Sequence, residues 1–225
     1  MTAKTKPRDD AALKQAVLLA ALPHAAFDGF SDKLLERARE EAGVTKAEAA
    51  RLFPHGPLSL VEEFSDWADN EMKARLAKKK LSALKIRERI KAAVMARIDV
   101  LRPHKEAARR AAAFLTLPPH AAAGAKLLYR TVDAMWRAAG DTSTDFNFYT
   151  KRAILAGVFS STMLRWFNDS AKDETATEAF LDHRIENVMQ FEKFKAQVKE
   201  RTKELPSLAS ILGRFSAGKS SAKDA

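Results

Sequence analysis

Apolar residues recur at helical spacing along most of the chain. Ile86, Ile90, Val94 and Ile98 follow one another at intervals of four residues, which places them on one face of a helix. The stretch 148–167 is apolar on most sides, so we expect it to form a central helix. No window of strict apolar and polar alternation is long enough to predict a strand. The pattern therefore predicts an all-α protein of about nine helices.

Helix-breaking residues divide this pattern into three parts. A Pro-His-Gly-Pro run over residues 54–57 closes a first group of short helices, and Pro206 opens a last one. We expect residues 1–57 to form a helix-turn-helix-like N-terminal subdomain, residues 58–204 to form the main helical domain, and residues 205–225 to form an amphipathic tail.

The N-terminal part contains a helix-turn-helix pattern. Ser31 can cap a helix that ends at Glu41, and Thr45 can cap a second helix over residues 46–53. A DNA-binding protein inserts this second helix into the major groove and neutralises phosphates around it. Here the helix reads Lys-Ala-Glu-Ala-Ala-Arg, and the first sixty residues hold nine Lys and Arg against eight Asp and Glu. We therefore expect the architecture without nucleic-acid binding.

The net charge of +10 is concentrated in residues 71–110, which hold fourteen Lys and Arg against four Asp and Glu. This stretch either forms solvated helix faces or docks an acidic partner or anionic lipid. The absence of cysteine excludes disulfides, thiolate metal sites and cysteine nucleophiles. The five histidines show no metal-ligand spacing, and no G-x-S-x-G catalytic motif occurs. Residues 213–220 match the P-loop pattern by chance, since no strand is expected before them and only five residues follow. We therefore expect a protein that is not an enzyme and that uses no metal or cofactor.

The longest apolar runs have seven residues, far short of the ~20 that span a bilayer. Residues 1–10 carry charge but no apolar region behind it, so neither a signal peptide nor a transit peptide is predicted. A cytoplasmic location follows as the expectation.

Two segments resemble known families. Residues 42–46 and 51–54, AGVTK and RLFP, resemble the N-terminal domain of TetR-type repressors. Residues 139–152, AGDTSTDFNFYTKR, together with VDAMW before them and FLDHRIEN after them, resemble the ubiquinone-biosynthesis accessory family typified by coenzyme Q biosynthesis protein nine. This second resemblance extends over about residues 10–195.

The resemblance implies a TetR-like fold that binds lipid and assists the hydroxylation of demethoxyubiquinone. It also implies that this chain binds an isoprenoid quinone precursor, a demethoxyubiquinone hydroxylase and the surface of the inner membrane. The hydroxylase surface would include Asp133, Met135, Asp145, Phe148 and Tyr149. Because positions i and i+2 lie on different sides of a helix, some of this aromatic surface should face outward. The alternative is that these aromatic side chains are buried.

The lipid pocket is expected between the helices 121–139, 145–167 and 173–198. Periodicity alone does not distinguish a lipid cavity from a filled core. The resemblance favours the cavity, whereas core packing is the alternative for each residue. TetR-like folds commonly dimerise through late helices, so a homodimer through residues 145–198 is also expected. The residues with suitable apolar character and spacing are Leu128, Val132, Trp136, Ile154, Val158, Phe159 and Met163.

The tail after Pro206 is amphipathic. Leu208, Ile211, Leu212 and Phe215 follow the spacing i, i+3, i+4, i+7, and Arg214 lies among them. Such an element can attach reversibly to anionic lipid. Docking on its own domain or on a second subunit is the alternative.

Three functions are consistent with these patterns. The first is a lipid-binding accessory protein of ubiquinone biosynthesis. The second is a TetR-type transcription regulator that senses an apolar ligand, which salt-dependent DNA binding would distinguish. The third is an interaction scaffold with a filled core, which the absence of a cavity would favour.

Overall fold

The computed structural model describes residues 9–142, 146–171 and 173–203. These ranges contain α-helices and short 3₁₀ helices and no strand, so the predicted all-α class is confirmed. The α-helices are α1 (Asp10–Asp28), α2 (Asp32–Glu41), α3 (Lys46–Leu52), α4 (Pro57–Ala77), α5 (Ile86–Leu101), α6 (Lys105–Thr116), α7 (Ala121–Ala138), α8 (Phe146–Phe167) and α9 (Thr175–Lys203). The 3₁₀ helices are η1 (Leu81–Ala83), η2 (Arg102–His104) and η3 (Pro118–His120).

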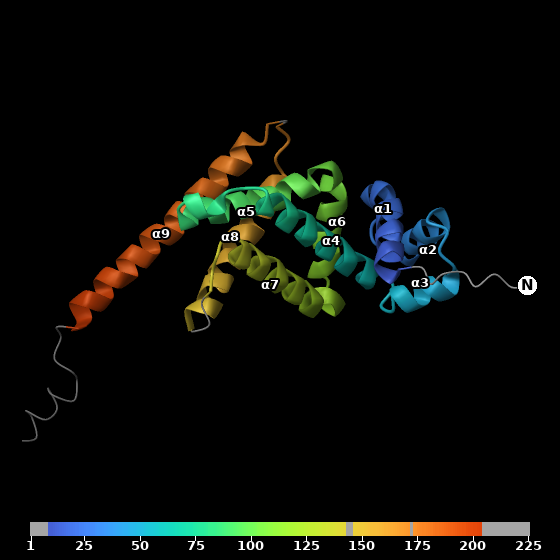
Figure 1. The fold of residues 1–225 in the computed structure, drawn as a ribbon, viewed down its shortest axis with the longest axis horizontal. Coiled ribbons are helices and arrows are strands. Elements are labelled where there is room, and N and C mark those ends of the chain that lie inside the picture. Colours follow the sequence, from blue (N-terminus) through green and yellow to red (C-terminus); the bar gives the residue numbers. More distant parts are fainter. Residues whose placement is uncertain (1–8, 143–145, 172, 204–225) are drawn as a thin grey trace, which may run out of the picture. The chain divides into compact units, whose positions relative to one another are not determined.

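Among the described residues, those up to Asp182 form one compact unit, and those from His183 belong to a second. Within the first unit, α1, α2 and α3 gather beside the beginning of α4 (Figure 1). In the same view α4 and α5 lie side by side, and α7 packs against α4, α5 and α8. The helix α4 begins at Pro57, the residue at which the expected N-terminal subdomain ends.

The helix-turn-helix forms as the sequence predicts, because capping side chains define both helix starts. The hydroxyl of Ser31 accepts a hydrogen bond of 3.2 Å from the amide of Leu34 at the start of α2. Thr45 and Glu48 form a reciprocal capping box at the start of α3. Gly43 adopts a φ of 62° in the turn between them, a conformation that favours glycine.

A buried ion pair joins the central helices. Asp69 of α4 and Arg97 of α5 are both buried, and their side chains approach to 3.2 Å. The hydroxyl of Thr131 on α7 donates to Asp69 at 3.0 Å. Burial raises the pKa of Asp69, while the charge of Arg97 and the Thr131 hydrogen bond oppose that shift. These contacts fix the relative positions of α4, α5 and α7.

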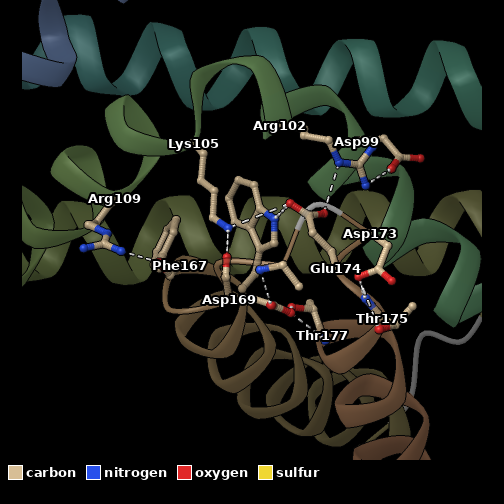
Figure 2. A network of polar contacts seen from close by, with 12 residues as sticks. Asp99, Arg102, Lys105, Arg109, Phe167, Asp169, Asp173, Glu174, Thr175 and Thr177 are labelled. Atoms are coloured by element: carbon tan, nitrogen blue, oxygen red, sulfur yellow. Dashed lines mark hydrogen bonds and ion pairs between the residues drawn. The ribbon is translucent and has the colours of Figure 1, made fainter.

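A polar cluster, the α8–α9 clasp, fastens the junction of α8 and α9 to η2 and α6 (Figure 2). Glu174 lies at its centre, buried, with a φ of 50° that residues with side chains rarely adopt. Its carboxylate accepts hydrogen bonds of 2.7 Å from the Trp166 indole and 3.0 Å from Arg102. Lys105 donates to the carbonyl of Asp169 at 2.6 Å. The clasp therefore holds the end of α8 against the beginning of α6.

Asp169 joins the α8–α9 clasp to the first turn of α9. Its carboxylate accepts hydrogen bonds from the hydroxyl of Thr177 at 2.7 Å and from the amide of Thr177 at 3.0 Å. The Thr177 hydroxyl, helped by backbone amides, holds the pKa of Asp169 below its ordinary value. On α5, Lys91 reaches Glu178 at 2.8 Å and Asp182 at 2.7 Å, which secures the first turns of α9.

Candidate lipid cavity and partner surface

A cavity of about 410 Å³ lies among α4, α5, α6, α7 and α8. Much of its wall consists of small side chains where α6 faces α7. At Gly124 a β-carbon would lie only 3.0 Å from the carbonyl oxygen of Leu115, so glycine permits close approach of the two helices there. The small lining residues are Ala108, Ala111, Ala112, Ala121, Gly124 and Ala125.

The cavity extends from an exposed rim to a buried polar wall. At the rim, Leu164 is 64% exposed, and Thr116 and Ala121 are also exposed. The inner wall includes two buried polar residues, Arg97 of the Arg97–Asp69 ion pair and Thr131, which donates a hydrogen bond to Asp69. The Nε of Arg97 has no hydrogen-bond partner among the described residues. An apolar molecule can therefore enter at the rim and lie along an apolar wall that has a few polar groups at its inner end.

Three of the seven residues predicted to bind lipid line this cavity: Leu128, Phe159 and Met163. Leu128 lies on α7, and Phe159 and Met163 lie on α8. The helices α7 and α8, two of the three expected around the pocket, do contribute to it.

The other four predicted lipid residues, Val132, Trp136, Ile154 and Val158, are not among the lining residues. Val132 and Val158 are buried in the helix packing instead. Trp136 donates its indole N–H to the carbonyl of Lys151 at 3.0 Å, which directs the ring toward the start of α8. None of the four borders this cavity, and their role in lipid binding stays a prediction.

The walls formed by α4, α5 and α6 were not predicted from the sequence. Val61 and Phe64 of α4 and Leu101 of α5 line the cavity. A signal for the α6 wall was present in the sequence, since residues 107–125 contain an unusually dense run of alanines. Alanine on facing helices leaves space that larger side chains would fill.

A second polar cluster, the Arg152 cluster, organises the segment that resembles the accessory family. Arg152 of α8 is buried, and its guanidinium reaches Asp133 at 2.9 Å and Asp141 at 2.8 Å. It also lies 3.5 Å from the centre of the Phe148 ring. Lys151 binds the other oxygen of Asp141 at 2.7 Å. The motif therefore encodes a structural ion-pair network at the junction of α7 and α8.

The predicted partner residues have different positions in this cluster. Tyr149 is 65% exposed and packs edge to face on Phe148, which is half-buried. Asp133 is half-buried and forms ion pairs with Arg152 and with Arg137, the latter at 2.6 Å.

Partial burial acts to raise the pKa of Asp133, but hydrogen bonds from Arg137 and Arg152 hold it below its ordinary value. Met135 is fully buried, so its expected position on a partner surface was wrong: it faces the core between α7 and its neighbours. Asp145 lies outside the described residues.

Some expectations concern regions or molecules that the structure does not contain. The tail residues Leu208, Ile211, Leu212, Arg214 and Phe215 lie outside the described residues. In the described part of the chain, no three His, Asp or Glu side chains gather in a way that could hold a metal ion. Among the helices described, none combines the length and apolar character that crossing a bilayer requires. The homodimer through residues 145–198 and the absence of a cofactor stay predictions.

Comparison with known proteins identifies the fold first. A crystal structure of a TetR transcriptional regulator from Nitrosomonas europaea matches with a TM-score of 0.61, covering 77% of this chain and 96% of that chain at 19% identity. The fold is therefore that of the TetR-like all-α proteins.

The sequence comparisons identify the family. Residues 121–192 match the COQ9 family model. The chain is 34% identical over 194 residues to rat ubiquinone biosynthesis protein COQ9, mitochondrial, and 32% identical to the human protein of that name. These matches cover 83% of this chain but 62% of the rat and 61% of the human protein, so the chain spans about three fifths of their length. The chain belongs to the COQ9 family.

Proposed function

We infer that this protein is a lipid-binding accessory protein of ubiquinone biosynthesis. It holds an isoprenoid quinone precursor in the cavity among α4–α8 and presents it to a demethoxyubiquinone hydroxylase at a membrane surface. The observation that carries this proposal is the apolar cavity of about 410 Å³ in a chain whose relatives are named ubiquinone biosynthesis proteins. A volume in this range suits a small ligand or one segment of a long one.

The cavity argues against a scaffold with a filled core. Protein interiors are close-packed, and a void of this size sacrifices dispersion contacts. A bound apolar molecule would restore those contacts. A lipid-binding function therefore accounts for the cavity, whereas a scaffold function does not.

The surface of α3 argues against a DNA-binding regulator. Lys46, Ala47 and Ala50 are exposed on α3, so two of the outward positions are methyl groups. Arg51 is also exposed, but it is held by Asp10 through two ion contacts, one of them 2.7 Å long. A helix that reads DNA must offer donors to bases and phosphates, and this one offers few.

Tyr149 and the half-buried Phe148 and Asp133 supply the proposed hydroxylase surface. The Arg152 cluster holds them on a rigid junction, so the surface needs no ordering when a partner binds. Charge introduced at Tyr149 should weaken hydroxylase binding without unfolding the domain, because this ring is mostly exposed.

The tail residues Leu208, Ile211, Leu212, Phe215 and Arg214 are proposed to attach the protein to the membrane. Deletion of residues 205–225 should sharply reduce binding to neutral phosphatidylcholine vesicles and leave the melting temperature nearly unchanged. A large fall in melting temperature would instead show that the tail packs on the helical domain.

The proposed function is tested by lipid extraction and mass spectrometry of the purified full-length protein. We expect an isoprenoid or another long-chain lipid in repeated preparations, and saturable binding of a short-chain prenylated quinone. Protein that is repeatedly lipid-free and binds no prenylated quinone would contradict the proposal.

A further inference from the structure

The chain between α4 and α5 carries a dense positive charge that neither the cavity nor the Arg152 cluster uses. We define the basic segment as residues 78–87, Lys-Lys-Lys-Leu-Ser-Ala-Leu-Lys-Ile-Arg. It contains five basic residues and no Asp or Glu. All five basic side chains are exposed, so the charge excess seen in residues 71–110 reaches the molecular surface here.

Two aliphatic side chains are exposed among these cations. Leu84 is 39% exposed and Ile86 is 45% exposed, whereas Leu81 is buried and anchors the segment to the domain. Exposed aliphatic residues interleaved with lysine and arginine are typical of elements that lie at a membrane interface. The cations meet anionic headgroups and the aliphatic side chains enter the boundary of the acyl chains.

The basic segment is held in one conformation by Arg89. The guanidinium of Arg89 donates to the carbonyls of Leu84 at 2.9 Å, Ser82 at 3.0 Å and Ala139 at 3.0 Å. Gly140 has a φ of 89°, and a β-carbon there would lie 3.2 Å from this guanidinium. Because the segment is already ordered, little conformational entropy is lost when it meets a surface.

A groove of about 650 Å³ lies beside the basic segment, between the end of α4 and the second half of α7. Three lysines, Lys73, Lys79 and Lys80, line it, and none of them forms an ion pair within the described residues. Arg130 and Arg137 also line it, although they pair with Asp66 and Asp133. The groove therefore presents uncommitted lysines, beside the arginine-paired carboxylate of Asp133, that a phosphate headgroup can contact.

We propose that the basic segment and this groove form a docking surface for an anionic phospholipid bilayer. The occupant is the membrane surface, because the site combines unpaired lysines with exposed Leu84 and Ile86 in one short ordered stretch. This surface is separate in sequence from the amphipathic tail. It requires anionic lipid, whereas the four large apolar residues of the tail also give affinity for neutral lipid. The proposal does not rest on the contents of the cavity.

The test compares full-length variants in sedimentation with phosphatidylcholine vesicles, with and without phosphatidylglycerol. The triple variant Lys78→Glu, Lys79→Glu and Lys80→Glu should bind the anionic vesicles at least about tenfold more weakly and bind the neutral vesicles unchanged. A control changes the exposed Lys33, Lys46 and Lys126 to Glu, which alters the net charge equally at scattered positions. The control should lose much less affinity. Equal loss in both variants, or none in the first, overturns the proposal.

A second variant tests the aliphatic part of the surface. Replacing Leu84 and Ile86 by Asn should weaken binding to anionic vesicles about fivefold, with the melting temperature retained because both side chains are already partly in water. If this variant binds as the wild type while the triple variant fails, the surface binds the anionic bilayer by charge alone, and the proposed insertion of Leu84 and Ile86 is wrong. Lipid extraction of the same variants separates this result from the cavity, because cargo should be retained in all of them.

Discussion

The two halves of α7 are built differently although they belong to one helix. The first half, residues 121–131, presents alanine and glycine toward α6 and borders the cavity. The second half, residues 132–138, carries Trp136 and Asp133, which pack into the Arg152 cluster. Side-chain volume and pairing therefore decide whether the space between α7 and the helix it faces, α6 in the first half and α8 in the second, stays open or is filled. A helical pattern of apolar positions is present in both halves, so the pattern alone does not separate them.

The difference also separates two roles. The filled half gives rigidity, because Arg152 is buried and satisfied by two carboxylates and one carbonyl. Under the proposed function, the open half provides the space for a ligand, whose binding would offset the cost of the cavity in stability. Four measurements test whether the two halves differ in this way.

The largest effect is expected from Arg152→Met in the filled half. The substitution leaves Asp133 and Asp141 near each other without the buried cation between them, so we expect a loss of about 3 kcal/mol in the free energy of unfolding. Urea denaturation followed by circular dichroism measures it. Arg137→Met is the matched control, since Arg137 also pairs with Asp133 but is mostly exposed, and it should cost at most about 1 kcal/mol. Similar losses in the two variants would show that the Arg152 cluster is not the rigid centre of this junction.

The next effect is expected from Glu174→Gln in the α8–α9 clasp, which supports the α8 wall of the cavity. The amide cannot satisfy both the Trp166 indole and Arg102 as the carboxylate does, so unfolding should become easier by about 2 kcal/mol. The same denaturation experiment measures this change. A stability equal to that of the wild type would mean that the clasp does not hold α8 in place.

The open half is tested by Ala112→Phe, which places a ring in the cavity. Extracted lipid and the affinity for a short-chain prenylated quinone should each fall about tenfold, equivalent to about 1.4 kcal/mol, with stability retained. Ala113→Phe is the control, because Ala113 is exposed and lies outside the lining. Unchanged lipid recovery in Ala112→Phe would place the cargo elsewhere.

The smallest effect concerns pH and Asp133. Because the folded protein lowers the pKa of this carboxyl, its contribution to stability is present above the ordinary carboxyl pKa of about 3.9 and is lost as pH falls through the lower folded value. The stability difference between the wild type and Asp133→Asn should therefore shrink as pH falls from about 5 to about 3. Urea midpoints of both proteins at several pH values measure this stability difference. A stability difference that grows on acidification would show that folding does not lower the pKa of Asp133.

Local features of the fold could be predicted from the sequence because they depend on neighbouring residues. The caps at Ser31 and Thr45 and the helical period of α5 are features of this kind. The helix expected over residues 46–53 ends one residue earlier, at Leu52.

The site could be predicted only in part. Leu128 and Trp136 both have apolar side chains on α7, eight residues apart, yet one lines the cavity and the other donates a hydrogen bond to the Lys151 carbonyl of α8. Their difference depends on what α6 and α8 place opposite them. For the same reason the pairs Arg102–Glu174 and Lys91–Asp182 join residues more than seventy positions apart and have no local signature.

The size of the cavity and the exposure of Leu164 at its rim have a consequence for transport. A polyprenyl chain of many isoprene units is longer than a hollow of about 410 Å³ can enclose, so most of such a molecule must remain outside the protein. The remainder cannot trail in water, because each exposed methylene costs about 0.8 kcal/mol. Under the proposed function, the protein would therefore bind one end of a quinone whose remaining chain stays in the bilayer leaflet, and it would not carry the whole molecule through the aqueous phase.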